Sequence, residues 1–217
     1  MVGENAETVE HRHEAGVALD KALRSIAPPD VTVGVRRISA ADLSSLFMLE
    51  SVATRRAVPS RQREFATGRA LLRQLIGCDI PIPVADSRAP ILPEGVKGSL
   101  AHDVDFAVAG VTREHTIRSL GIDLEPQGEL SHEIAEIVLR KDERGIDAHL
   151  AFTLKEAAYK AWSGLGGEML EHHDVRLYIR ASTFHAEVLP DRFHMDGMFA
   201  STAHHWVGLV VVRVGAE

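Results

Sequence analysis

Apolar and polar residues alternate in several short segments of this chain, and this alternation predicts a series of β-strands. Residues 31–38 alternate apolar with small or polar side chains, whereas 104–111 and 117–125 are largely apolar, and each of these segments is expected to be a strand. Residues 99–103 lead into the second of these strands. Three further strands are expected at 175–179, 184–189 and 206–214.

In other segments the apolar positions recur with the period of a helix. Four helices are expected, within 41–58, 61–76, 131–140 and 146–162. Ser60 and Ser131 are candidate N-caps for the second and third of them, and Gly77 is a candidate stop for the second. The inward face of the third is expected to comprise Ile134, Ile137 and Val138.

A helix followed by strands occurs twice along the chain, which predicts an α+β protein made of two similar halves. The first half spans 1–113 and the second spans 114–217. Residues 1–25 are expected to be a flexible extension that runs into a helix. The segment 78–98 contains four of the nine prolines and predicts an extended, semi-rigid loop.

Composition is that of a globular cytoplasmic protein. The 217 residues are 45% hydrophobic and 25% charged, which is enough for a buried core. No apolar run reaches the ~18–20 residues of a membrane span, and the N-terminus lacks the apolar core of a signal peptide. Cys78 is the only cysteine, which excludes an intramolecular disulfide and fits a reducing compartment. We therefore expect a cytoplasmic protein without a membrane span, and a monomer.

The charge balance argues against a nucleic-acid partner, because 24 basic residues against 31 acidic ones give a net charge of −7. The distribution is nevertheless uneven. Arginines cluster at Arg55, Arg56, Arg61, Arg63, Arg69 and Arg73, with Glu64 as the one acid between them. A local basic surface suits a small anionic ligand or an acidic partner. For any single arginine, an ordinary solvated helix face is an equal alternative.

Two carboxylates stand two positions apart in the apolar segment 117–125. Asp123 and Glu125 flank Leu124, so on a strand both point to the same face. Acids are depleted from strands, and two on one face repel each other unless a positive charge lies between them. A divalent cation is the favoured explanation, because Mg²⁺ is usually held by carboxylates together with substrate phosphates. The alternative is that both project from a strand end and pair with arginines.

A third carboxylate, Glu156, lies four positions before Lys160 in the predicted helix over 146–162, so the two share a helix face. With Asp123 and Glu125 it makes a carboxylate trio beside lysines, which indicates phosphate chemistry. On spacing alone, an ordinary i,i+4 ion pair is the simpler interpretation of Glu156 and Lys160.

Ser99 and His102 follow Gly98 at a loop-to-strand junction, where a hydroxyl, backbone amides and an imidazole are able to cradle a phosphate. No third partner or nucleophile elbow accompanies them, so a hydrolase triad is not expected. The paired histidines lack the cysteine pairs or the His-Glu-x-x-His spacing of zinc sites. Neither a P-loop nor a dinucleotide-binding glycine motif is present.

Four motifs in fixed order give the chain a family resemblance. They are Arg61-x-x-Glu64-Phe65-x-x-x-Arg69, Pro93-x-Gly95-x-x-Gly98-Ser99-Leu100-x-His102, Gly121-Ile122-Asp123-Leu124-Glu125-Pro126, and Phe152-x-x-Lys155-Glu156-Ala157-x-Tyr159-Lys160-Ala161-Trp162. Over residues 60–178 the chain resembles the 4′-phosphopantetheinyl transferases of the large, pseudo-dimeric class. It is most similar to the enterobactin-synthetase-type and actinobacterial type II enzymes. The resemblance implies two α+β halves related by a pseudo-two-fold axis, with coenzyme A in the cleft between them.

The same resemblance implies transfer of the phosphopantetheine arm of coenzyme A to a serine of an apo acyl or peptidyl carrier protein. Adenosine 3′,5′-bisphosphate would be released. Mg²⁺, or Mn²⁺ in its place, would be held by Asp123, Glu125 and Glu156. Glu156 would also be the catalytic base, and Lys160 would act with Lys155 to neutralise the phosphates. Such enzymes serve secondary metabolism, including siderophore, polyketide and nonribosomal peptide synthesis.

Coenzyme A itself would be bound by residues from the first half and from the lysine motif: Arg61, Arg69, Arg88, Ser99, His102, Lys155 and Lys160. Ser99 and His102 would contact its phosphates, and the arginines of the Arg61 motif its nucleotide end. Two departures from the family pattern affect these contacts. Asp103 stands where the family usually has Cys, Ser or Thr, so it either points away from the phosphates or weakens binding. The loop before Gly98 lacks the usual Gly and Trp, and Arg88 would replace a basic residue usual just before it.

Two other functions fit the same residues. A coenzyme A-binding or carrier-binding module that has lost turnover is favoured by Asp103 and the altered loop, but the intact acidic and lysine set opposes it. A metal-dependent phosphohydrolase would use the same carboxylates with water as the acceptor. It would not need the nucleotide contacts expected of Arg61 and Arg69.

Overall fold

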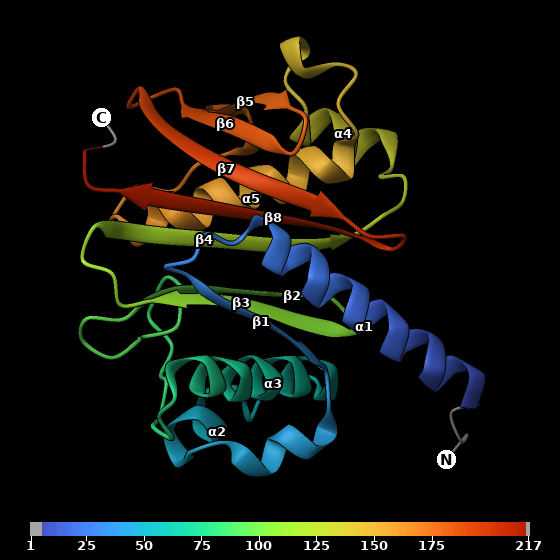
Figure 1. Ribbon diagram of the computed structural model, residues 1–217, viewed down its shortest axis with the longest axis vertical. Coiled ribbons are helices and arrows are strands. Elements are labelled where there is room, and N and C mark those ends of the chain that lie inside the picture. The colour runs from blue at the N-terminus through green and yellow to red at the C-terminus, as the bar shows by residue number, and fades with distance from the viewer. Residues whose placement is uncertain (1–5, 216–217) are drawn as a thin grey trace.

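Two antiparallel sheets lie side by side in the computed structural model, which describes residues 6–215, with side chains from residue 10 onward (Figure 1). The first sheet has the order β1-β3-β2, with β1 Thr32–Arg37, β2 Lys97–His102 and β3 Phe106–Thr112. The second has the order β4-β8-β7-β6-β5, with β4 Ile117–Pro126, β5 Val175–Arg180, β6 Thr183–Val188, β7 Phe193–Ser201 and β8 His205–Arg213. The sheets adjoin along β2 and β4, the strands that carry two of the sequence motifs.

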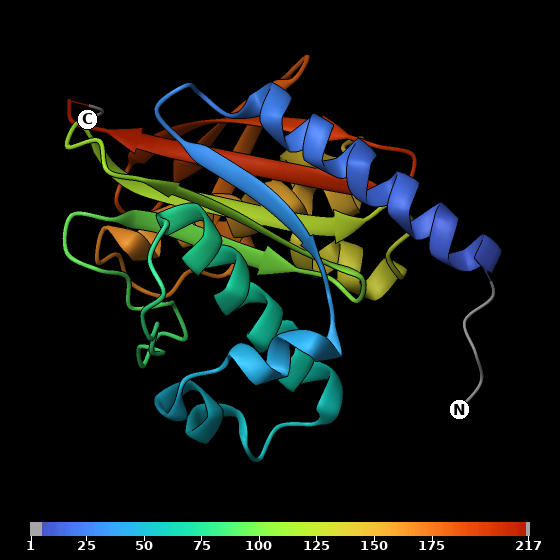
Figure 2. The same ribbon diagram turned by 60° about the horizontal axis from the view of Figure 1, so that its bottom comes forward.

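Helices cover both sheets. They are α1 Ala6–Ile26, α2 Met48–Thr54, α3 Pro59–Ile76, α4 His132–Val138 and α5 Ala148–Gly164, with 3-10 turns at η1 Ala40–Ser45, η2 Lys141–Glu143 and η3 His172–Asp174. Strand β1 lies between α1 and α3 (Figure 2), so these two helices cover opposite faces of the first sheet. Helix α5 packs on the second sheet, on the face away from α1.

Helices α3 and α5 bury apolar side chains against the strands beneath them. Leu71 and Leu72 of α3 pack on the β3 alanines of the first sheet. Ala157 and Ala161 of α5 belong to the core of the second sheet. These small side chains allow a close approach of helix to sheet, which is needed where α5 crosses β4.

Helix α1 corrects the expectation of a flexible extension over 1–25. Leu19 and Leu23 are completely buried, in a cluster that includes β1 of the first sheet and β8 of the second. Burying two leucines contributes roughly 3–6 kcal/mol, so this part of the chain is held in place by packing against both sheets. Residues 1–5 lie outside the described residues.

The helix predictions were partly right. The segment 41–58 forms η1 and α2 instead of one helix. Helix α3 begins at Pro59, which favours the first helical turn because it lacks an N–H, and Ser60 is therefore not the N-cap. Gly77 ends α3 with φ 75°, as predicted from its ability to adopt a left-handed conformation. Ser131 caps α4 by accepting a hydrogen bond from the amide of Ile134.

Three strand and burial predictions were wrong. Residues 99–111 form the hairpin β2-β3 instead of a lead-in to one strand. Strand β7 was missed, because its Asp196 and Gly197 are residues that strands normally disfavour. Ile134 and Ile137 of α4 are exposed, and only Val138 of the predicted apolar face is buried.

The turn between β3 and β4, at residues 113–116, joins the two sheets close to the predicted boundary at 113. The division into 1–113 and 114–217 stays a prediction, because α1, which belongs to the first half, packs on strands of both sheets. The pseudo-two-fold axis also stays a prediction. No helix in the described part of the chain is long and apolar enough to cross a membrane.

Candidate functional site

Asp123 and Lys160 meet between β4 and α5, although they are far apart in the sequence. The Lys160 ammonium donates to Asp123 Oδ1 at 2.6 Å and to the carbonyl oxygen of Ile122 at 3.2 Å. Asp123 is 5% exposed, and the Lys160 side chain is 29% exposed. The Lys160 ammonium is therefore bound to two oxygens of β4. Spacing alone favoured a different partner, Glu156 on the same helix.

The close contact of α5 with β4 places this pair. A Cβ on Gly121 would lie 1.8 Å from the carbonyl oxygen of Ala157, so only glycine fits at this crossing. One turn further along, the Ser119 hydroxyl donates to the carbonyl oxygen of Ala161 at 2.7 Å. Both contacts hold α5 against β4 next to Asp123. The motif therefore needs a glycine at position 121, two residues before Asp123.

The carboxylates of the predicted trio influence one another. Burial, and then the charge of Glu156, raise the pKa of Asp123 to about 6 although the Lys160 ammonium opposes this shift. Burial and the neighbouring Asp123 raise the pKa of Glu125 to about 7. Burial also raises the pKa of Glu156. Such shifts are typical of functional sites, where groups of like charge are brought together.

The donor set suits a hard divalent cation. Oδ2 of Asp123 is buried and has no hydrogen-bond partner among the residues that the structure describes, an arrangement that costs about 1–3 kcal/mol unless something positive reaches it. Among the side chains described, from residue 10 to residue 215, no three His, Cys, Asp or Glu residues are gathered as ready-made metal ligands. The trio is thus electrostatically coupled and supplies carboxylate oxygens, which Mg²⁺ prefers, but it is not drawn together around a common point.

Ser99 and His102 lie on the adjoining edge strand β2. The Ser99 hydroxyl accepts a hydrogen bond from the amide of Ile122 at 3.0 Å, which ties β2 to β4 beside Asp123. His102 contacts the Arg61 guanidinium and lies 3.7 Å from Glu64. Burial and the charge of Arg61 lower the pKa of His102. The structure therefore brings the second, third and fourth motifs together, with Arg61 reaching in from α3.

Of the other two arginines predicted to bind coenzyme A, Arg69 is buried and Arg88 is exposed to solvent. Arg69 is buried, with its Nε donating to the carbonyl oxygen of Ile82 at 2.8 Å and its guanidinium 4.2 Å from the centre of the Phe65 ring. Burial lowers its pKa to about 10. Arg88 is exposed in the turn at 85–89, with φ 67°. Of the three arginines predicted to bind coenzyme A, Arg61 is the one that the structure brings to His102.

Lys155 does not reach this site. Its ammonium donates to Glu143 Oε2 at 2.6 Å, to the carbonyl oxygen of Val138 at 2.8 Å and to that of His172 at 2.9 Å. An ammonium has three donors, so none is left for a phosphate. The prediction that Lys155 binds coenzyme A was wrong, because helix geometry turns adjacent residues of α5 to different faces.

The Asp103 carboxylate is held by the turn that follows it and by β8. One of its oxygens accepts from the amides of Asp105 and Phe106, and the other is 2.8 Å from His205 Nε2. Sequence reasoning did not find His205 as a partner, because the two residues are 102 positions apart. The pairing of β8 with β4, which places His205 opposite Pro126, is the structural cause.

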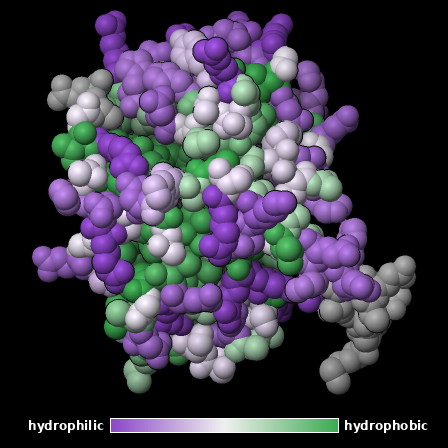
Figure 3. Space-filling view, in the orientation of Figure 1, coloured by the Kyte–Doolittle hydropathy of each residue, from purple (hydrophilic) through white to green (hydrophobic). Residues whose placement is uncertain are grey.

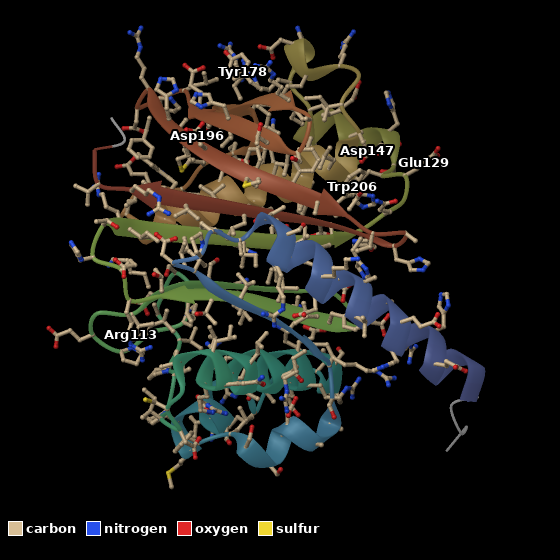
Figure 4. The ribbon with its side chains drawn as sticks, in the orientation of Figure 1. Arg113, Glu129, Asp147, Tyr178, Asp196 and Trp206 are labelled. Carbon is tan, nitrogen blue, oxygen red and sulfur yellow. The ribbon has the colours of Figure 1, made fainter. Side chains whose placement is uncertain are left out.

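Two cavities of the described part of the molecule lie outside the carboxylate trio. One of about 900 Å³ is bounded by α1, the turn at 103–106 and the start of β8. Another, of about 580 Å³, lies on the outer face of the second sheet, where Tyr178 and Asp196 are found (Figure 4). Apolar patches show on this face of the space-filling view between polar side chains (Figure 3). Neither cavity is lined by Asp123, Glu125 or Glu156.

Known proteins resemble the chain in the same region. The model of the 4′-phosphopantetheinyl transferase N-terminal domain matches residues 49–112. The chain is 38% identical over 165 residues to the 4′-phosphopantetheinyl transferase Svp of Streptomyces mobaraensis, covering 68% of this chain and 67% of Svp. It is 31% identical to Npt of Nocardia iowensis, covering 65% of this chain and 74% of Npt. It is also 32% identical over 92 residues to enterobactin synthase component D of Salmonella typhi, covering 37% of this chain and 38% of that protein.

Proposed function

Because this chain belongs to the 4′-phosphopantetheinyl transferase superfamily and is an enzyme of that type, we propose that it transfers phosphopantetheine from coenzyme A to a serine of an apo acyl or peptidyl carrier protein. Adenosine 3′,5′-bisphosphate is the second product. The acidic pair and the lysine at the β4–α5 crossing are the observation that carries this proposal. We also propose that the protein is a monomer and that it acts in the cytoplasm, where the single cysteine fits the reducing conditions.

Asp123, Glu125 and Glu156 would hold Mg²⁺, or Mn²⁺ in its place. The unpartnered, buried Oδ2 of Asp123 supports this assignment. When bound, the cation supplies positive charge that neutralises phosphate oxygens and the coupled carboxylates. Its removal would leave the raised pKa values of Asp123 and Glu125 described above.

Lys160 holds positive charge where the leaving group becomes more negative. Its ammonium is fixed by Asp123 Oδ1 and the Ile122 carbonyl oxygen, so little reorganisation is needed during the reaction. Arg61, Ser99 and His102 orient the phosphates from the side of the first sheet. Arg61 is the most exposed of these, with half of its side chain open to solvent, and is able to turn toward an anion.

Glu156 is the proposed base for the serine hydroxyl of the carrier, directly or through a water. A general base works best when its pKa lies near the operating pH. Burial raises the pKa of Glu156 toward that range. Asp123 is bound to Lys160 instead, so it is less suited to take up a proton.

A panel of apo-carriers incubated with the protein, coenzyme A and Mg²⁺ tests the proposal by mass spectrometry. The panel includes siderophore, polyketide and fatty-acid carriers. We expect one or more to gain the mass of one phosphopantetheinyl group, and Glu156→Gln to abolish the gain.

The alternatives give different outcomes in the same assay. Binding of coenzyme A without an adduct on any carrier would identify a binding module. Cleavage of coenzyme A with water as acceptor, without an adduct, would identify a phosphohydrolase. Either result overturns the proposed transfer.

A further inference from the structure

Asp103 lies next to a residue that is proposed to bind coenzyme A. It follows His102 directly, at the turn where β2 passes into β3, and His102 contacts Arg61. A carboxylate next to His102 in the chain would compete with a phosphate for the Arg61 guanidinium if it turned toward that side chain.

Three donors hold the Asp103 carboxylate in the turn. The amides of Asp105 and Phe106 donate to Oδ1 at 2.8 and 2.6 Å, and His205 Nε2 lies 2.8 Å from Oδ2. Burial works to raise the pKa of Asp103, but these donors outweigh it and hold the pKa below its usual value. The carboxylate is therefore charged, and both of its oxygens are already bound, by the turn amides and by His205.

In the described part of the chain, the hydrogen bond to Asp103 is the one that the His205 side chain makes. Its side chain is buried at the start of β8, with the Phe106 ring edge-on at 5.6 Å between centroids. Its Nδ1 is buried without a hydrogen-bond partner in the described part of the chain. Burying an imidazole with one unpaired nitrogen is costly, so a histidine at this position needs an explanation beyond packing. The bond of its other nitrogen, Nε2, to Asp103 across the two sheets provides that explanation.

We propose that His205 is a positioning residue for the coenzyme A site: it holds the Asp103 carboxylate in the β2-β3 turn and so keeps Arg61 and His102 available to the phosphates. This inference rests on the proposed function. It assigns no contact between His205 and coenzyme A. It also gives a physical reason why an acidic residue is tolerated directly after His102.

A double-mutant cycle tests the proposal with the full-length protein. His205→Ala frees one oxygen of Asp103, so we expect the KM and the Kd for coenzyme A to rise about tenfold with little change in kcat. Asp103→Asn removes the charge but keeps an oxygen that accepts from the turn amides. In the double variant His205→Ala/Asp103→Asn, the KM and Kd are expected to return to within about twofold of wild type.

Asp105→Asn is the matched control, because it removes the same charge from the same turn. The Asp105 carboxylate pairs with Arg12 at 3.3 Å, whereas His205 bonds to Asp103. Adding Asp105→Asn to His205→Ala should leave coenzyme A affinity as weak as in the single variant. If His205→Ala lowers kcat or stability with an unchanged Kd, or if Asp103→Asn fails to restore the Kd, the positioning role is wrong.

Calorimetric binding of coenzyme A separates this inference from the proposed function. A wild-type protein that binds coenzyme A but modifies no carrier would overturn the transfer and leave the Kd comparison intact. A wild-type protein that modifies carriers while the Kd is insensitive to His205→Ala would overturn the positioning role alone.

Discussion

Gly121 and Ala157 are in such close contact that a Cβ on the glycine would lie 1.8 Å from the Ala157 carbonyl oxygen. Their contact sets the distance between β4, which carries Asp123, and α5, which carries Lys160. The acidic pair and the lysine therefore depend on a residue that has no side chain of its own.

Gly121→Ala is expected to destabilise the protein by about 3 kcal/mol or more, because backbone atoms cannot move aside as a flexible side chain does. Urea unfolding measures the loss. Gly128→Ala is the control, since the nearest atom to its added Cβ is 3.8 Å away. A Gly121→Ala protein as stable as the control would contradict the close crossing of α5 and β4.

Lys155→Met is expected to lower the free energy of unfolding by about 3–5 kcal/mol, because it leaves the buried Glu143 carboxylate without its cation. The double variant Lys155→Met/Glu143→Gln should recover part of that loss in urea unfolding. The KM for coenzyme A of the folded fraction should stay unchanged. A raised KM at unchanged stability would indicate that Lys155 does act at the phosphates.

The sequence predicted the parts of this site that depend on local periodicity. Asp123 and Glu125 share a face because they are two apart on a strand, and Glu156 and Lys160 because they are four apart on a helix. Partners such as His205 for Asp103, or Glu143 for Lys155, depend on which elements pack together. Periodicity states which face a residue occupies, but not what lies opposite it, so these long-range pairs required the structure.

Ile134 and Ile137 show that periodicity can also predict burial wrongly. Their spacing fits an apolar helix face, yet α4 has only seven residues and buries Val138 alone of that face. A short helix turns little of its surface to the core, so a pattern that would be reliable over four turns was misleading over two.

The contribution of Asp123 and Glu125 to the stability of the metal-free protein is expected to fall as the pH rises from about 4 to about 7. Asp123 and Glu125 have folded-state pKa values of about 6 and about 7, above the ordinary values of about 4 in an unfolded chain. The folded state thus binds more protons in this window, and its advantage is lost as they dissociate. For buried Asp123 the loss is about 2–3 kcal/mol.

Thermal unfolding across that pH range measures this dependence. Asp123→Asn should flatten the pH profile, and millimolar Mg²⁺ should raise the Tm more at pH 7.5 than at pH 5. An Asp123→Asn profile that matches the wild-type profile would contradict the raised pKa of Asp123.

Arg61→Ala is expected to raise the KM for coenzyme A about five- to tenfold, because a charge-assisted hydrogen bond to phosphate is lost. The kcat should change little at saturation. Arg56→Ala is the matched control, since Arg56 is an exposed arginine just ahead of the same helix. Equal effects of the two substitutions would indicate general charge attraction instead of a specific contact.

Glu156→Gln is expected to reduce transfer about 10²–10⁴-fold, because an amide cannot accept the serine proton as a base does. The fold and the affinity for coenzyme A without metal should be retained, which circular dichroism and calorimetry check. Glu129→Gln, at an exposed position beyond β4 (Figure 4), removes the same charge and should leave transfer at the wild-type rate. Transfer by Glu156→Gln at that rate would assign proton removal to another group, and Glu125, whose pKa of about 7 also suits a base, would be the next to replace.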